Sequence, residues 1–214
     1  VGVHVRYDFT ELALDNTNKY TPYIDTDSAV ALASGGITLT TLATDTKTAT
    51  QTQGGIWWYP GKNCTVEHKF KIDVVTTVAI YAGFSDAVSE ATGLLPHGIV
   101  GATQTATATD SAGFHFDVRQ TLAYWNIVSS KAAGSAKAFT QLASTYIPVA
   151  ATDLVLRTAI DTAGNASYFW NGTQVGYKAL AVTVATPLIP YFGIRNTSAA
   201  AHVATLRRVD LWQD

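Results

Sequence analysis

The pattern of hydrophobic and polar residues is clearest over residues 153–177, where three short runs of β-forming residues follow one another. The second and third runs are separated by Asn171 and Gly172 alone. An Asn-Gly pair between two such runs is the strongest short-range signal for a β-hairpin, because both turn residues need a positive φ and these two adopt it at the least cost. The pattern therefore predicts three consecutive antiparallel strands, the last two joined by a tight turn.

A two-residue turn also sets the register of the hairpin. It would place Trp170 opposite Thr173 and Tyr168 opposite Val175, and it would bring Tyr177 to the same face. A face that carries so many large apolar side chains needs a second sheet to cover it. We therefore predict an all-β fold, a two-sheet antiparallel β-sandwich.

Three further stretches favour this fold. Residues 63–73 alternate between an apolar and a charged face, which is typical of an antiparallel strand with one side in the core and the other in water. Residues 78–85 are apolar on both faces and are expected to form a central strand. Leu206 and Val209 would both face the core only if an extra residue lies between them, which predicts a β-bulge there.

The first quarter of the chain has a much weaker pattern. Residues 1–53 are rich in Thr and in turn-forming residues, and we interpret them as an N-terminal arm or as edge strands. Residues 54–214 would form the β-sandwich, since a single all-β domain commonly has this length. Within this part of the chain, residues 86–110 form a long polar stretch, which is typical of loops that bind a ligand or pack on a neighbour.

Composition narrows the possible function classes. Only 14% of the residues are charged and the net charge is −2, so the chain lacks the basic patch of a nucleic-acid-binding protein. No apolar run approaches the roughly 20 residues that span a bilayer, and we expect neither a nucleic-acid nor a membrane partner.

Cys64 is the only Cys, so no intrachain disulfide can form. The sequence has no Met, and we expect Val1 to follow a removed initiator Met or a processing site.

The chain resembles tailed-bacteriophage virion proteins with a concanavalin-like jelly-roll domain, found as head decoration or capsid-associated proteins. The resemblance runs from about Trp57 to Trp212, in the segments VEHKFKIDVVTTVAIYAGFSD, DSAGFHFDV, LVLRTAIDTAGNASYFWNGTQVG and TPLIPYFGIRNTSAAAHVATLRRVDLW. The hairpin also looks like that of laminin-G and legume-lectin sandwiches. The resemblance implies a structural virion protein that decorates or stabilises the capsid exterior. Its partners would be the major capsid protein and its own copies, as a homo-oligomer.

A carbohydrate-binding, lectin-like module for surface or host attachment is the alternative, and it would be extracellular. Both functions use outward aromatic side chains, either to stack on a sugar or to bury against a subunit. The Trp residues have a structural alternative, which is to fill the sandwich, whereas Phe169 is expected on the polar face of the hairpin. The candidate residues for glycan or subunit contact are Trp57, Trp58, Trp125 and Phe169.

Catalytic signals are weak in this sequence. A glycosidase needs two carboxylates that flank the scissile bond, and none of Glu11, Glu67 and Glu90 has an acidic partner at a suitable spacing on its own strand. No Gly-x-Ser-x-Gly or EF-hand motif is present. We expect His68 to face the core and His115 to point outward. The sequence thus predicts a protein that is not an enzyme, with no catalytic residue, metal or cofactor.

Overall fold

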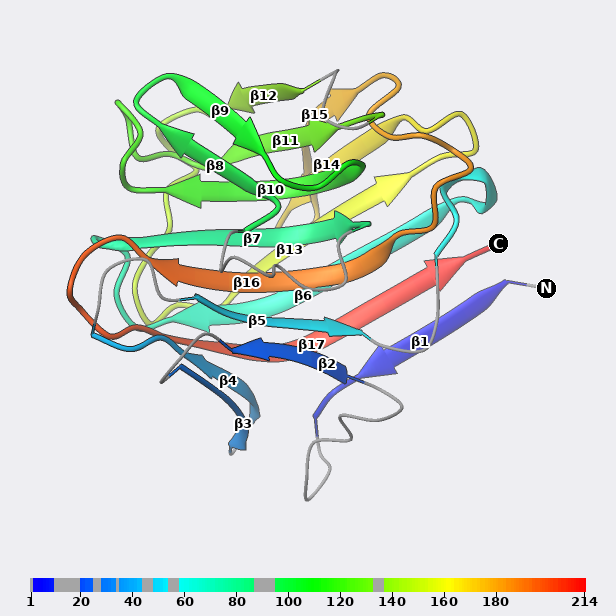
Figure 1. Cartoon of the computed structure of the whole chain (residues 1–214). Helices are drawn as coiled ribbons and strands as arrows, with labels where there is room; N and C mark the ends of the chain where they lie inside the picture. Colours follow the sequence, from blue (N-terminus) through cyan, green and yellow to red (C-terminus); the bar gives the residue numbers. More distant parts are fainter. Residues whose placement is uncertain are drawn as a thin grey trace.

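A computed structural model describes most of the chain and shows two β-sheets packed face to face (Figure 1). For residues 20–24 and 48–53 the structure describes the backbone alone, and for the other described residues it also describes the side chains. The predicted all-β sandwich is confirmed. The described residues are 2–9, 20–24, 28–33, 35–43, 48–53, 58–86, 95–132 and 137–214.

Every pair of neighbouring strands in both sheets is antiparallel. Sheet A has the order β15 (Thr173–Lys178), β14 (Ala166–Trp170), β13 (Leu154–Ile160), β6 (Cys64–Ile72), β17 (Val203–Gln213), β4 (Gly36–Thr40) and β3 (Ala29–Ala33), and β1 (Val3–Tyr7) also pairs with β17. Sheet B has the order β12 (Ala138–Gln141), β11 (Asn126–Ser130), β10 (Ser111–Asp117), β7 (Val78–Ser85), β16 (Ile189–Asn196), β5 (Thr48–Gln53) and β2 (Tyr20–Ile24). A short 3-10 helix, η1 (Pro60–Lys62), precedes β6.

The core lies between the two sheets and is built from the alternating positions of the central strands. Burial alternates residue by residue along β6, and β7 is buried along its whole length between β10 and β16, as the sequence predicts for both. Aromatic rings meet across the layers: Phe70 of β6 lies 4.7 Å from Phe192 of β16, and Phe114 of β10 lies 5.6 Å from Tyr168 of β14. Such tilted and edge-to-face contacts are the favoured packing of aromatic pairs.

The hairpin of β14 and β15 begins in the predicted register and then departs from it. Trp170 pairs with Thr173, as expected, but a β-bulge shifts the ladder so that Tyr168 pairs with Gly176 and not with Val175. Tyr177 is consequently turned to the outer face, where 56% of it is exposed. The expectation that Tyr177 shares the core face was therefore wrong.

Close packing between the sheets explains the position of this bulge. A Cβ atom at Gly176 would lie 2.5 Å from Cδ1 of Ile127, which belongs to the opposite sheet. Only glycine leaves room for Ile127 at that point, and the extra residue of the bulge lets Val175 still pack against the core. A bulge also interrupts β17 between Leu206 and Arg208, which confirms the irregularity predicted there.

A separate hairpin, β8 (His97–Val100) and β9 (Thr103–Ala106), lies over the outer face of sheet B (Figure 1). Its apolar residues form a second small cluster with outward residues of the sheet, among them Tyr81 and Tyr191. The hairpin lies within the long polar stretch that the sequence marks as unusual. One of its roles is therefore to cover part of sheet B.

A chain of hydrogen bonds fastens this hairpin to the sheet. Gln104 Nε2 lies 3.2 Å from the Ala138 carbonyl, which can only accept a hydrogen bond, so the Gln104 atom at this position is the NH2 group. The same NH2 group donates its second hydrogen to His97 Nδ1 at 2.9 Å. The His97 proton is then on Nε2 and is donated to Ser111 Oγ at 2.7 Å, and the Ser111 hydroxyl lies 2.7 Å from Ser130 Oγ. In this network His97 is neutral, with Nδ1 unprotonated.

Strands from the first 53 residues join both sheets. β1, β3 and β4 belong to sheet A, and β2 and β5 extend sheet B. β2 and β3 lie at sheet edges, in keeping with the interpretation as edge strands. The domain boundary at residue 53 stays a prediction.

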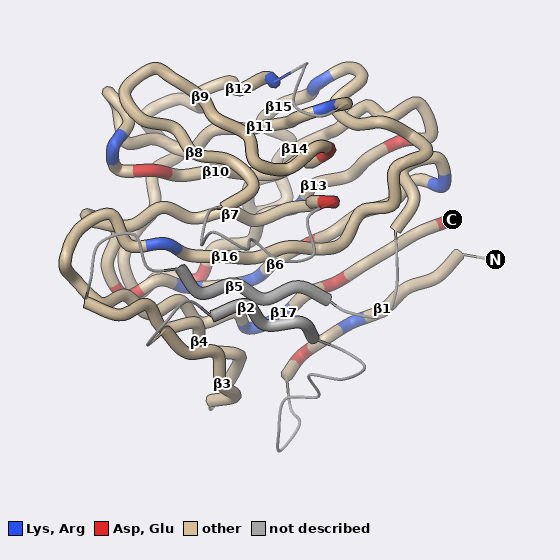
Figure 2. The backbone as a smooth tube through the Cα atoms, viewed as in Figure 1, with Lys and Arg blue, Asp and Glu red and all other residues tan. Residues whose placement is uncertain are grey.

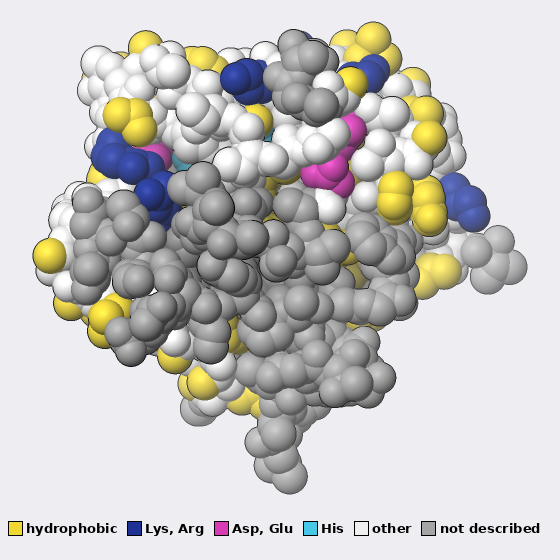
Figure 3. Space-filling model, viewed as in Figure 1, with side chains coloured by type: hydrophobic (Ala, Val, Ile, Leu, Met, Phe, Trp, Pro, Cys, Tyr) yellow, Lys and Arg dark blue, Asp and Glu magenta, His cyan; other side chains and the backbone are white. Residues whose placement is uncertain are grey.

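Charged residues are sparse and scattered along the described backbone (Figure 2). On the face of sheet B, uncharged groups dominate the described surface, and the acidic and basic side chains form small, separate groups (Figure 3). Within the described residues, no helix is long and apolar enough to cross a membrane.

Candidate functional site

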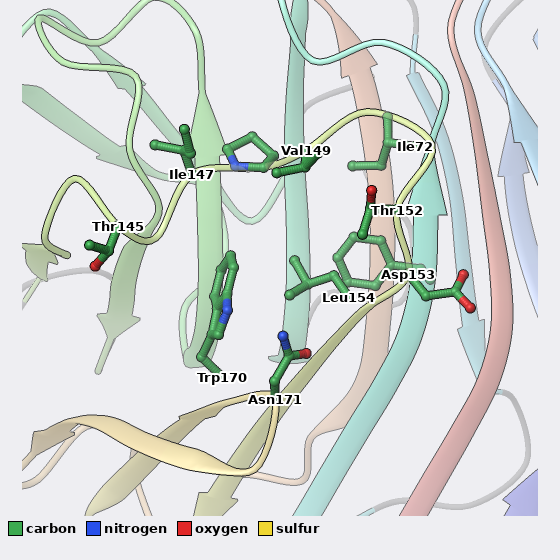
Figure 4. Close-up of a pocket in the computed structure, with 11 residues that line it drawn as sticks. Ile72, Thr145, Ile147, Val149, Thr152, Asp153, Leu154, Trp170 and Asn171 are labelled. Atoms are coloured by element: carbon green, nitrogen blue, oxygen red, sulfur yellow. The ribbon is translucent and has the colours of Figure 1, made fainter.

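A pocket of about 200 Å³ opens at one end of the sandwich, beside the Asn-Gly turn (Figure 4). We call it the end pocket. Core residues of sheet A, including Phe70 and Leu154, form one wall, and the segment 145–153 forms another. Trp170 and Asn171, the last residue of β14 and the first of the turn, complete it.

Trp170 is the aromatic surface of the end pocket. It is half-buried, and its ring faces Leu154 across the cavity (Figure 4). Two other rings hold it in an edge-to-face arrangement, Tyr146 at 5.5 Å and Trp125 at 6.0 Å. Because both neighbours are anchored, Trp170 presents a fixed ring to the cavity without a further ordering cost.

Asn171 places an amide group at the base of the pocket. It has a φ of 47°, the left-handed conformation that the tight turn requires. Its Oδ1 accepts the Val155 N–H at 3.0 Å, and its own N–H donates to the Val155 carbonyl at 2.8 Å. These bonds fix the side chain, whose Nδ2 points into the pocket (Figure 4). The pocket therefore has a pre-oriented hydrogen-bond donor.

The wall from 145 to 153 is held by backbone hydrogen bonds. The Trp125 N–H donates to the Tyr146 carbonyl at 3.2 Å, and the Ala151 N–H donates to the Ile72 carbonyl at 2.6 Å. Between these anchors, Ile147 is 43% exposed and Val149 is 60% exposed. The rim of the pocket is thus apolar and open to solvent.

The end pocket is close to neutral. Its one carboxylate, Asp153, points away from Trp170 (Figure 4) and is paired with Arg207 at 2.7 Å and Lys69 at 3.5 Å. The remaining polar groups in the lining are the hydroxyls of Thr145 and Thr152. Such a cavity can hold a small uncharged molecule that has an apolar face and a hydroxyl-bearing edge.

The structure separates the four aromatic residues that the sequence singled out. Trp57 lies outside the described residues. Trp58 and Trp125 are buried in the core, with 1% and 0% exposure, which is the structural alternative that the sequence left open. Phe169 lies on the outer face of sheet A, as expected, with the Arg157 guanidinium 3.9 Å from its ring centroid. A contact role for these residues stays a prediction.

Sequence reasoning missed Trp170 because the hairpin pattern assigned it to the core face. It does lie on that face, but the cavity left beside segment 145–153 keeps it partly exposed. The neighbouring Asn-Gly turn was recognised for its backbone and not for its side chain. A bulky aromatic residue directly before a turn was the available signal.

Carboxylates also come together across strands, which a search along single strands could not detect. Glu67 of β6 and Asp210 of β17 are opposite each other in the ladder. Arg208 lies between them, 2.9 Å from Glu67 and 2.6 Å from Asp210. An arginine in this position stabilises both negative charges. Within the described residues, no group of three or more His, Cys, Asp or Glu residues could hold a metal ion.

His68 and His115 point in the directions that the sequence predicted, and both are buried. His68 faces the core, and burial lowers its pKa to about 3. His115 points away from the core but is also fully buried, and this burial lowers its pKa. Burial alone would raise the pKa of the neighbouring Asp117, but hydrogen bonds from Arg119, at 2.9 and 2.6 Å, and the proximity of His115 hold it well below its usual range.

Comparison with known proteins finds similarity in structure only. No family model and no curated protein matches the chain. Among solved structures, the LamA catalytic domain from Zobellia galactanivorans has a TM-score of 0.67 and 9% identity, covering 98% of this chain and 96% of that one. An endo-acting O-glycanase of the human gut microbiota has a TM-score of 0.68 and 10% identity, with 98% of both chains covered. The Emp47p carbohydrate recognition domain has a TM-score of 0.62 and 11% identity, with 94% and 93% covered.

The chain has a concanavalin-like jelly-roll fold. The alignments cover nearly the whole of this chain and of these neighbours, so the match includes both facing sheets. A sialidase also matches, with 97% of this chain covered, but the jelly roll spans only 18% of the sialidase chain. At these identities the likeness shows the fold alone.

The comparisons correct one expectation from the sequence. We expected a protein that is not an enzyme, but the solved structures with the same fold include the LamA catalytic domain, an O-glycanase and a sialidase. That expectation was wrong, because it took the lack of an acidic pair within one strand as grounds to exclude catalysis in a fold that glycan-acting enzymes use. None of the structures named here is a virion protein.

Proposed function

We propose that this jelly roll binds a neutral carbohydrate in the end pocket. The observation that carries the proposal is the partly exposed Trp170 ring beside the inward-pointing amide of Asn171. A sugar ring has an apolar C–H face and an edge of hydroxyl groups. The C–H face packs on an aromatic ring, and the hydroxyl groups accept hydrogen bonds from an amide.

The size and polarity of the pocket fit one sugar unit. A volume of about 200 Å³ is enough for a single pyranose ring, with the rest of a chain leaving over the apolar rim at Ile147 and Val149. One aromatic contact and a few neutral hydrogen bonds contribute roughly 1 kcal/mol each. We therefore expect affinity in the millimolar range, on the order of −4 kcal/mol.

The structural neighbours support this proposal at the level of the fold. The Emp47p structure is of a carbohydrate recognition domain, and a LamA variant forms a complex with laminaritriose and laminaritetraose. These ligands are those of the other proteins. They make a glycan the first class of ligand to test, and the end pocket the first site.

A glycan array with matched variants tests the proposal. Trp170→Ala removes the stacking ring, and Asn171→Asp keeps the oxygen that accepts the Val155 N–H but removes the amide donor. We expect wild-type protein to bind at least one neutral glycan, Asn171→Asp to bind it about three- to tenfold more weakly, and Trp170→Ala to lose it. Tyr177→Ala, which removes an exposed aromatic ring outside the pocket, is the control. No binding to any neutral glycan, or binding unchanged in both pocket variants, would refute the proposal.

Cleavage is tested on any glycan that binds. Release of reducing sugar by wild-type protein and by Glu67→Gln measures whether the Glu67–Asp210 pair acts chemically. Equal release by the two proteins would exclude Glu67 from a catalytic role. A large loss in the variant, with glycan binding retained, would assign it one.

A virion location is our prediction from the sequence resemblance and is compatible with glycan binding. A lectin-like module on a particle surface would serve attachment to host glycans. The low charge and the Thr-rich composition are consistent with close packing between copies. Mass spectrometry of purified particles, with this protein in a fixed ratio to the capsid protein, would support that location, and its absence from the particles would contradict it.

A further inference from the structure

A second hollow lies on the outer face of sheet A, away from the end pocket. It has a volume of about 300 Å³ and is lined by Thr65, Arg157, Ala159, Phe169 and Trp212. We call it the outer groove. None of these residues lines the end pocket.

Register explains why the groove exists. Ala159 pairs with Thr65 on β6, and Thr65 pairs with Trp212 on β17, so two small side chains form a floor beside a large one. Phe169 lies on β14, at the opposite side of this floor. The strands that carry the two aromatic walls are three strand spacings apart, about 14 Å, which leaves room for a sugar ring between the side chains.

Both walls of the outer groove are held in place. The Arg157 guanidinium lies 3.9 Å from the centroid of the Phe169 ring, a cation–π contact that orients its N–H groups. Trp212 stacks on His4 of β1, with the ring centroids 5.0 Å apart and the planes within 8°. The groove is therefore pre-organised, with a fixed cation on one side and an indole on the other.

The charge of Arg157 has no direct ion-pair partner in the described part of the chain. Among the residues that the structure describes, no carboxylate lies within ion-pair distance of it. Its cross-strand neighbour Glu67 is engaged by Arg208 at 2.9 Å. Asp210, next along this face, is bonded to both Arg208 and Arg6. Arg157 therefore remains available to an acidic ligand.

We propose that the outer groove binds an acidic sugar residue, whose carboxylate or sulfate pairs with Arg157 and whose apolar face packs against Trp212. A guanidinium presents two parallel N–H groups that match either acid group. The indole supplies the stacking surface for the sugar ring, as Trp170 does in the end pocket. This inference is independent of the proposal for the end pocket, because the two sites share no residue and prefer ligands of different charge.

A matched pair of disaccharides isolates the acid group. Cellobiouronic acid differs from cellobiose only in a carboxylate that replaces one hydroxymethyl group. A sulfated cellobiose carries a sulfate as its acid group instead of the carboxylate. Each sugar is titrated into ¹⁵N-labelled protein while the Trp212 indole N–H signal, assigned with Trp212→Phe, is followed by NMR. We expect saturable shifts of this signal with at least one acidic sugar, at least about tenfold tighter than with cellobiose. The sugar that binds more tightly identifies the preferred acid group.

Two variants that each lose one positive charge distinguish a direct contact between Arg157 and the acid group from general electrostatic attraction. Arg157→Gln should weaken acidic-sugar binding at least about tenfold and leave cellobiose unchanged. Lys71→Gln, which removes a cation from the same face of β6 outside the groove, should change neither. Arg157→Lys keeps the charge without the paired N–H groups and should bind with intermediate affinity.

Three results would overturn the proposal. They are no saturable shift of Trp212 with either acidic sugar, equal affinity for acidic and neutral sugars, and equal effects of Arg157→Gln and Lys71→Gln. Trp170→Ala should leave the Trp212 shifts intact. If that variant abolished them, the ligand would belong to the end pocket and not to the outer groove.

Discussion

Mild acid is expected to destabilise this protein well above the range in which carboxylates titrate. His68, His97 and His115 are fully buried, and burial lowers the pKa of each below the ordinary value of 6.5. The unfolded chain therefore binds protons that the folded chain does not. Stability contributed by the neutral rings is complete above about pH 6.5 and is lost as the pH falls below it.

The loss of stability in acid depends on the number of buried, neutral histidines. Each histidine that stays neutral in the folded state contributes about 1.4 kcal/mol of lost stability per pH unit below 6.5, or about 2 kcal/mol at pH 5. His115 contributes less than this, because Asp117 partly offsets the effect of burial. The three together give roughly 4 to 6 kcal/mol, a large share of the 5–15 kcal/mol that holds a typical domain folded.

Urea unfolding at a series of pH values measures this loss directly. The wild-type free energy of unfolding should fall between about pH 7 and pH 5, with a slope near 3 to 4 kcal/mol per unit at the acid end. His68→Leu removes one buried ring of similar size, so its slope should be smaller by about 1.4 kcal/mol per unit. Tyr177→Ala, which replaces an exposed aromatic residue and leaves the three buried histidines in place, should keep the wild-type slope. A flat profile, or the same slope in His68→Leu, would refute the reasoning.

Three further outcomes follow from local packing. Gly83→Ala should destabilise the fold by several kcal/mol in urea unfolding, because the new Cβ would lie 2.4 Å from a backbone carbonyl, whereas Gly61→Ala, whose nearest contact is 3.4 Å, should cost less than about 1 kcal/mol; equal costs would contradict this. The buried Cys64 thiol, whose pKa burial raises to about 12, should react with a thiol reagent only when the protein unfolds, and rapid reaction in the native state would contradict its placement. Gln104→Leu should speed hydrogen exchange in the β8–β9 hairpin by about fivefold, since it removes a bond to His97 worth roughly 1 kcal/mol, and unchanged exchange would show that the network does not hold the hairpin.

The fold was predictable where the pattern is local. Alternation along β6 and the continuous apolar run of β7 reveal one half-exposed and one central strand. The bulge in β17 could also be inferred, from the spacing of Leu206 and Val209. The bulge in β15 could not, because it depends on Ile127, which reaches Gly176 from the other sheet.

The candidate sites were less predictable, because each is assembled from distant parts of the chain. The outward position of Phe169 follows from hairpin parity, but its Arg157 partner follows only from the pairing of β13 with β14. The end pocket exists because segment 145–153 does not close over Trp170. The Glu67–Asp210 pair joins strands more than a hundred residues apart, and no single stretch of sequence signals it.

The most direct test of glycan binding at the end pocket is the Trp170 indole N–H signal during titration. Laminaritetraose and a mixture of neutral mucin-type O-glycans are suitable probes, since enzymes with this fold act on glycans. A saturable shift of the Trp170 signal with either probe, while the signals of the buried Trp58 and Trp125 indoles move little, is the result we predict. No shift with either probe, or shifts confined to residues outside the pocket, would contradict the account.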